Sequence, residues 1–101
     1  MSSAPRPPGE VDDPLAPWQV DGFCATLTGM ADATVRAYRG DVAAFARWAS
    51  ESGVDDPCSV DRGTLRRWLG ALAARGSARS TVARRASTLR RYFDWAARTG
   101  V

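Results

Sequence analysis

The chain contains 101 residues, of which 45% are hydrophobic, and carries a formal net charge of +3. This length supports one domain with a single core, and no apolar run approaches the ~18 residues that a membrane-spanning helix needs. The two cysteines, Cys24 and Cys58, are accompanied by no histidine, so the sequence offers no zinc-ligand spacing. We expect a cytoplasmic protein with reduced thiols, no bound metal or cofactor and no membrane attachment.

The net charge conceals an asymmetry between the two parts of the chain. Residues 1–61 contain ten acidic residues and four arginines, whereas residues 62–101 contain one aspartate and ten arginines. All fourteen cations are arginines. A GC-rich genome can explain the absence of lysine, so the positions of the arginines are more informative than their type. Their concentration in the second part indicates an anionic partner.

Residues 1–16 are rich in proline and polar residues, which predicts a flexible N-terminal arm. Residues 17–101 are expected to form the folded domain. A first helix is predicted near residues 17–28, where Pro17 fits the first turn and Gly29 the end. Its apolar face has the i, i+3, i+4, i+7 spacing of Val20, Phe23, Cys24 and Leu27. Trp18 falls outside this face, and the sequence leaves open whether it packs on the arm or is exposed for a partner.

Asp32 is expected to cap a second helix over residues 33–51, with Gly53 after its end. The buried stripe of this helix is predicted to comprise Val35, Tyr38, Val42, Phe45, Ala46 and Ala49. Its polar side is predicted to carry Arg36, Gly40 and Arg47, with Thr34 in the first turn. A glycine in mid-helix costs about 1 kcal/mol relative to alanine. The missing side chain at Gly40 therefore suggests a close approach, by another helix or by a nucleic-acid backbone.

Asp61 is expected to cap a third helix over residues 62–75, which Gly76 ends. Its core face is predicted to comprise Leu65, Trp68, Leu69 and Leu72. Ser77 is expected to cap the fourth helix, and Gly100 to end it. Four helices joined by short loops, without a strand pattern, predict an all-α fold, a compact four-helix bundle.

The fourth helix has two chemically different faces. Its apolar stripe is predicted to comprise Val82, Ala86, Leu89, Phe93, Ala96 and Ala97. Its polar side carries Ser80, Arg84, Ser87, Thr88, Arg91 and Arg98, with Arg79, Arg85 and Arg90 on the flanks. Because Asp94 is the only acid in the helix, most of these arginines lack a partner three or four residues away. Several also lie in the first half, where the helix dipole disfavours cations. This pattern favours DNA as the partner.

Three segments resemble a known family: ATVRAYRGDVAAF (33–45), TLRRWLGALAARG (64–76) and SARSTVARRASTLRRYFDW (77–95). In this order and spacing they are similar to the N-terminal core-binding (SAM-like) domain of tyrosine recombinases and integrases, especially the Xer and phage-integrase branches. The resemblance extends over about residues 17–100. It implies a SAM-like bundle of orthogonal helix pairs that forms half of a C-shaped clamp on duplex DNA. A separate C-terminal domain would carry the catalysis.

The resemblance implies DNA contacts from the second and fourth helices. Those of the second helix would be Thr34, Arg36, Ala37 and Gly40, and those of the fourth Ser80, Thr81, Arg84, Ser87, Thr88 and Arg91. The polar face described above contains most of the same fourth-helix residues. Arg84 is expected to contact guanine O6 and N7. Phosphate contacts are expected from Arg36, Arg79, Arg85 and Arg91.

The chain also departs from the full family pattern. It contains no histidine, hence no His-x-x-Arg pattern, and no lysine. Tyr38 lies in an apolar stripe and Tyr92 at the edge of one, so we expect neither to be a nucleophile. We predict that this chain is the non-catalytic N-terminal part of a longer recombinase from a bacterial nucleoid. The implied partners are double-stranded DNA, the catalytic domain and neighbouring subunits of a tetramer on DNA, whereas the isolated domain is expected to be monomeric.

Two other functions are compatible with the sequence. A helical protein–protein interaction module would present Trp18 or Trp48 to a partner. A helix-turn-helix transcription regulator would use the third and fourth helices, which are joined by a short turn. The fourth helix, at about 20 residues, is longer than most recognition helices.

Overall fold

The computed structural model describes residues 15–101, so the predicted arm lies outside the described residues except for Leu15 and Ala16. The described chain contains helices and no strand, which confirms the all-α prediction. In chain order the elements are the 3-10 turn η1 (Ala16–Trp18), α1 (Val20–Ala25), α2 (Asp32–Glu51), the 3-10 turn η2 (Pro57–Ser59), α3 (Arg62–Ala74) and α4 (Arg79–Thr99).

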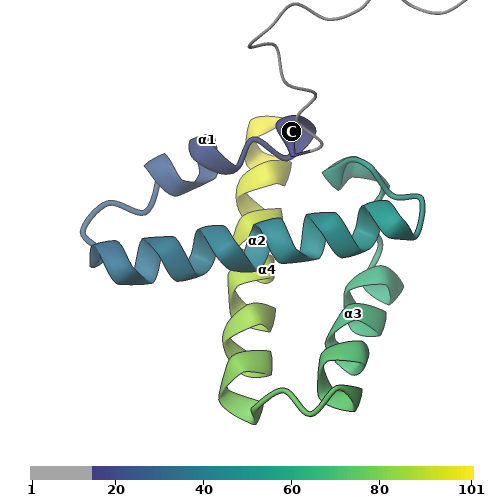
Figure 1. Ribbon diagram of the computed structural model, residues 1–101. Coiled ribbons are helices and arrows are strands. Elements are labelled where there is room, and N and C mark those ends of the chain that lie inside the picture. Colours follow the sequence, from purple (N-terminus) through teal and green to yellow (C-terminus); the bar gives the residue numbers. More distant parts are fainter. Residues whose placement is uncertain (1–14) are drawn as a thin grey trace, which may run out of the picture.

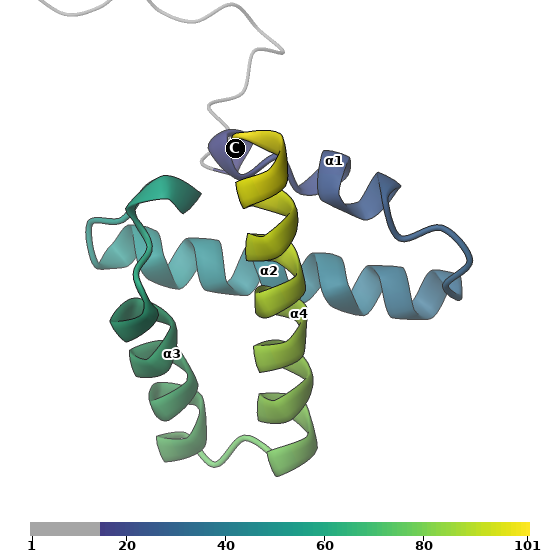
Figure 2. The ribbon, with the colours of Figure 1, turned by 180° about the vertical axis from the view of Figure 1, so that it is seen from behind.

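The two longest helices, α2 and α4, cross each other near their middles (Figure 1). The short α1 lies beside the first half of α2, and α3 runs beside the first half of α4 in the opposite direction. Seen from behind, the same arrangement holds (Figure 2). Because α1 and α3 flank different arms of this cross, no described helix covers the corner between the first halves of α2 and α4, residues 32–41 and 79–88. We call it the open corner.

The core combines aliphatic side chains with a cluster of aromatic ones, to which Trp18 belongs. Its side chain is only 1% exposed, and its ring packs edge-on against Phe45 at 5.8 Å between centroids and, with the ring planes tilted by 32°, against Tyr92 at 6.0 Å. Aromatic pairs in this geometry contribute beyond the area that they bury. Trp18 is thus a core residue, and neither exposure to a partner nor packing on the N-terminal arm is needed to explain its position.

The first predicted helix is shorter than expected at both ends: α1 stops at Ala25, and its start is delayed because the backbone turns at Gln19, which has a left-handed φ of 48°. The turn separates η1 from α1, so the wheel position assigned to Trp18 in a continuous helix was wrong. The apolar positions of the pattern are nevertheless all buried: Val20, Phe23, Cys24 and Leu27. Burial also raises the pKa of the Cys24 thiol.

One of the three predicted helix caps is confirmed. The Asp61 carboxylate accepts hydrogen bonds from the backbone nitrogen of Thr64 at 2.7 Å and from its hydroxyl at 2.9 Å. The caps predicted at Asp32 and Ser77 are wrong by one residue. Alanines occupy the two cap positions without a side-chain hydrogen bond, and Asp32 lies instead in the first turn of α2. There its negative charge still interacts favourably with the helix dipole.

The buried stripe of α4 is wider than the sequence pattern predicted. Ala86, Leu89 and Ala96 are buried as expected, but Ala97 is exposed. The side chains buried in addition are Thr88, Tyr92 and Trp95. The physical reason is that α4 packs on α2 across one side and on α1 and α3 along its flanks, so that more of its circumference is covered than by a single neighbour.

Candidate nucleic-acid interface

The residues predicted to contact DNA lie mainly on the first halves of α2 and α4, the two arms that border the open corner. The exposed members are Arg36, Gly40, Arg79, Ser80, Arg84, Ser87 and Arg91. The half-buried members are Thr34, Ala37, Thr81 and Arg85. We call these eleven residues the basic face. The twelfth predicted contact, Thr88, is buried.

Gly40 lies on an open surface. A Cβ atom placed on it would meet no atom within 4 Å, so no helix of the described chain packs against this glycine. Close helix packing, one of the two explanations considered for Gly40, is therefore wrong for residues 15–101. The surface of α2 around Gly40 remains free for an external partner.

A buried carboxylate lies where α2 and α4 cross. Asp41 is only 1% exposed, and its two oxygens accept hydrogen bonds from Arg84 of α4, at 3.0 Å from Nε and 2.7 Å from Nη2. The Thr88 hydroxyl lies 2.9 Å from Oδ2 of the same carboxylate. A buried charge is tolerated only when it is paired and hydrogen-bonded, and here both conditions are met. Pairing with Asp41 raises the pKa of Arg84 above its ordinary value.

This arrangement corrects the expectation that the arginines of α4 lack acidic partners. The expectation considered only acids within the same helix, whereas Asp41 lies 43 residues before Arg84 in the sequence. A signal was present, because Asp41 follows Tyr38 by three residues and precedes Phe45 by four, which places it on the apolar stripe of α2. A lone carboxylate on such a stripe indicates a cation from another element.

Thr88 is unsuited to contact DNA in this structure. Its side chain is fully buried, and its hydroxyl can donate to Asp41 or to the Arg84 carbonyl oxygen, 3.0 Å away. The helical wheel placed Thr88 on the polar side. The crossing of α2 over α4 covers that side at this position, and only tertiary packing could reveal it.

Arg85 packs against the core with most of its side chain, which is 25% exposed. Its guanidinium carbon lies 5.5 Å from the centre of the Trp68 ring, within the range of a cation–π interaction. Its Nε is 3.3 Å from Oδ1 of Asp41 but makes no hydrogen bond. Two guanidinium groups thus face one buried carboxylate, which leaves a local excess of one positive charge.

The other arginines of the basic face, Arg36, Arg79 and Arg91, are exposed and form no ion pair with any residue in the range 15–101. Arg79 occupies the first turn of α4, which contains no acid. Positive charge at this end of a helix is unfavourable by a few tenths of a kcal/mol. An anion bound nearby would remove this penalty.

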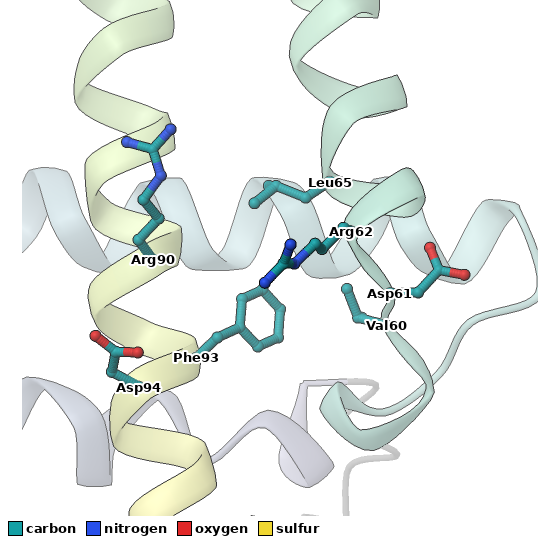
Figure 3. Close-up of a pocket in the computed structure, with 7 residues that line it drawn as sticks. All are labelled: Val60, Asp61, Arg62, Leu65, Arg90, Phe93 and Asp94. Atoms are coloured by element: carbon teal, nitrogen blue, oxygen red, sulfur yellow. The ribbon is translucent and has the colours of Figure 1, made fainter.

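A separate groove of about 570 Å³ lies between α4 and the start of α3 (Figure 3). Phe93 projects from α4 toward Val60 and Leu65, and Asp61, Arg62, Arg90 and Asp94 complete the lining. None of the residues predicted to bind DNA lines this groove. Across the part of the chain that the structure describes, no group of acidic residues and cysteines is arranged to hold a metal ion, and no helix is long and apolar enough to cross a membrane.

Two observations bear on the alternative functions. Trp18 is buried and therefore inaccessible to a partner, whereas Trp48 is half-buried and stacked on Phe45 at 6.2 Å, so it is only partly accessible to one. Helices α3 and α4 lie side by side and run in opposite directions. A helix-turn-helix pair instead crosses at roughly 90–120°.

Comparison with known proteins gives a consistent assignment. Residues 20–100 match the family model described as "Phage integrase, N-terminal SAM-like domain". The chain is 41% identical over 83 residues to the tyrosine recombinase XerC of Chromohalobacter salexigens, which covers 81% of this chain and 28% of that protein. The corresponding values are 39% over 82 residues for XerC of Mycobacterium sp. strain KMS (80% and 27%) and 34% over 84 residues for XerC of Corynebacterium glutamicum (80% and 26%). The chain spans about a quarter of the length of these relatives. No solved structure matches it significantly.

Proposed function

The chain belongs to the family of phage integrase N-terminal SAM-like domains, and from this premise we propose that it binds duplex DNA through the basic face of α2 and α4. The observation that carries the proposal is the set of exposed arginines on the basic face that have no acidic partner within residues 15–101. Arg36 lies on α2, and Arg79 and Arg91 lie on α4; because these two helices cross (Figure 1), the three arginines together can contact a curved anionic surface. DNA presents such a surface through its phosphates.

The small polar residues of the basic face suit the same partner. Hydroxyl groups near a helix start can donate to phosphate oxygens, a role that we assign to Thr34, Ser80, Thr81 and Ser87. Ala37 and Gly40 leave α2 without large side chains where the backbone of DNA would approach. Thr88 is left out of this assignment because its hydroxyl is already engaged inside the protein.

The arginines are assigned two roles. Arg36, Arg79, Arg85 and Arg91 contact phosphates and position the domain without reading sequence, and Arg85 can contribute only through its outer edge. Arg84 contacts a pair of hydrogen-bond acceptors on DNA, and this contact is sequence-specific if the pair is O6 and N7 of a guanine. Four phosphate contacts predict that the logarithm of the binding constant falls with that of the salt concentration with a slope of roughly −3.6.

We propose that this domain binds recombination sites on behalf of a separate catalytic domain, within a tetramer of recombinase subunits. The matched relatives are named tyrosine recombinases and come from bacteria. We therefore propose a role in DNA recombination or integration at the bacterial nucleoid, and we expect the domain alone to be monomeric and unable to cleave or join DNA.

The test compares Arg91→Gln with Arg98→Gln, which remove the same charge from the same helix. Arg91 lies on the basic face, whereas Arg98 lies in the last turn of α4, far from the open corner. Binding to a 20-base-pair duplex is measured by fluorescence anisotropy at several salt concentrations. We expect Arg91→Gln to reduce the magnitude of the salt slope by about 0.9 and Arg98→Gln to leave it unchanged. Equal effects of the two variants would refute the assigned face.

A further inference from the structure

We propose that Asp41 is a positioning residue for DNA recognition, which holds one edge of the Arg84 guanidinium so that the opposite edge faces the nucleic acid. The inference rests on the proposed function and adds a residue that is itself inaccessible to DNA. It identifies the recognised group as a pair of hydrogen-bond acceptors on duplex DNA, either guanine O6 and N7 or two phosphate oxygens.

The hydrogen bonds of Arg84 divide its guanidinium into two edges. A guanidinium has five N–H donors in a plane. The Nε donor and one donor of Nη2 bind the two oxygens of Asp41. The second donor of Nη2 and both donors of Nη1 make no hydrogen bond within residues 15–101. The Arg84 side chain is 43% exposed. Its outer edge therefore retains the geometry of a bidentate donor while the inner edge is occupied.

The carboxylate that holds Arg84 is itself fixed. Its 1% exposure removes competing water, the Thr88 hydroxyl lies 2.9 Å from Oδ2, and Arg85 Nε lies 3.3 Å from Oδ1. A free arginine side chain loses conformational entropy when a partner immobilises it. Here most of that loss has already occurred on folding, so binding is favoured by preorganisation.

The side-chain charges where α2 crosses α4 favour a partner that is anionic and carries hydrogen-bond acceptors. Arg84 and Arg85 together carry two positive charges against the single negative charge of Asp41. A single arginine–aspartate pair has no net charge, so it could orient a DNA group without attracting it. The cluster of Arg84, Arg85 and Asp41 does both, because it combines an oriented donor edge with one uncompensated positive charge.

The sign of one measurement separates positioning from simple electrostatics. Asp41→Asn removes a negative charge next to the basic face, so arginines that act only as charges would bind DNA as tightly or more tightly. If Asp41 positions Arg84, the same change weakens binding, because an amide offers Arg84 one acceptor in place of two. The probes are a 20-base-pair duplex enriched from a random pool with the wild-type protein and a scrambled duplex of the same composition.

We expect Asp41→Asn to weaken binding to the enriched duplex about tenfold, the value of one bidentate contact. Asp32→Asn, which makes the same charge change in the exposed first turn of α2, is expected to leave binding unchanged or slightly tighter. In an Arg84→Ala background, Asp41→Asn should cause no further loss. Weakening confined to the enriched duplex identifies guanine as the acceptor, and equal weakening on both duplexes identifies phosphate.

Folding is monitored by circular dichroism at the binding temperature. Should Asp41→Asn be unfolded there, Arg84→Lys takes its place, because one ammonium cannot hold Asp41 and present a second bidentate edge. Its expected loss is the same, and wild-type affinity of folded Arg84→Lys would overturn the inference. Wild-type affinity of folded Asp41→Asn would do so as well, while leaving the proposed function intact if Arg91→Gln still lowers the salt slope. Failure of the wild-type protein to bind either duplex at low salt would instead refute the proposed function.

Discussion

The hydroxyl of Tyr92 joins α4 to the turn that precedes α1, and Tyr92→Phe tests how much this bond contributes to the fold. The hydroxyl donates a hydrogen bond of 2.6 Å to the carbonyl oxygen of Trp18. Both side chains are buried, and Tyr92 packs edge-on against Phe23 at 5.3 Å between ring centroids. Phenylalanine keeps the ring contacts and removes only the hydroxyl.

Removing the donor leaves a buried carbonyl oxygen with one hydrogen bond fewer, which costs about 1–2 kcal/mol. For a domain of this size, each kcal/mol lowers the melting temperature by roughly 4–8 °C. We therefore expect Tyr92→Phe to melt about 5–15 °C below the wild-type protein at pH 7. Tyr38→Phe is the matched control, since Tyr38 is half-buried and its hydroxyl makes no hydrogen bond in residues 15–101. Its melting temperature should change by less than about 4 °C.

The same variant predicts a pH dependence of known sign. Burial raises the pKa of Tyr92 above its ordinary value of 10.0, because the buried phenolate would lose its hydration. In the unfolded chain the Tyr92 hydroxyl ionises near pH 10, whereas in the folded protein it stays protonated at that pH. Stability is therefore complete below pH 10 and falls above it, by up to about 1.4 kcal/mol per pH unit. Phenylalanine cannot ionise and lacks this loss.

The assay is urea unfolding of both proteins, followed by circular dichroism, at pH values from 7 to 11. The difference in unfolding free energy between wild type and Tyr92→Phe should be constant up to about pH 9 and shrink above it, approaching zero near pH 11. Equal stabilities at pH 7, or curves that stay parallel up to pH 11, would refute the inference that the Tyr92 hydroxyl is buried and hydrogen-bonded.

Two further changes test the core and a helix cap. Leu89→Ala, at a fully buried position, is expected to lower the unfolding free energy by about 2–5 kcal/mol in urea titrations. The control Leu65→Ala, at a half-buried position beside the groove, should lower it by clearly less. Equal losses would contradict the core assignment. Asp61→Asn keeps a capping oxygen, so it should change little at neutral pH. Hydrogen bonds from Thr64 hold the pKa of Asp61 below its ordinary value of 3.8. These bonds therefore stabilise the folded state fully above pH 3.8, and the stabilisation is lost as the pH falls through the lower pKa of the folded state. The melting temperature of Asp61→Asn should therefore fall less between pH 5 and 2 than that of wild type, and equal falls would contradict the assigned cap.

The local elements of this fold were largely predictable because their causes are local. Apolar spacing alone identified Phe23, Phe45 and Leu89 as core residues, and all three are fully buried. The Asp61 cap followed from its position before an amphipathic run, and Gly100, with a φ of 78°, ends α4 as glycine does where the backbone must turn left-handed. These features depend on neighbours within a few residues.

The two misplaced helix caps were local errors of one residue, whereas the errors about burial share another origin, because burial depends on how the segments pack in three dimensions. Trp18 was misplaced because the turn at Gln19 redirects it into the core. Ala97 was assigned to the core from its wheel angle, but it is exposed. A helical wheel describes the direction of a side chain on its own helix and cannot specify what lies opposite.

The sequence by itself determined that this chain is helical, that it resembles an integrase domain, and that its arginines gather in the second part of the chain. Only the tertiary structure decided which of those arginines are free. The crossing of α2 over α4 buries Thr88 and pairs Arg84 with Asp41, whereas Arg79 and Arg91 of the same helix have no acidic partner within residues 15–101. The reason is that a buried carboxylate must find its cations wherever packing brings them, and here packing joins residues 43 positions apart.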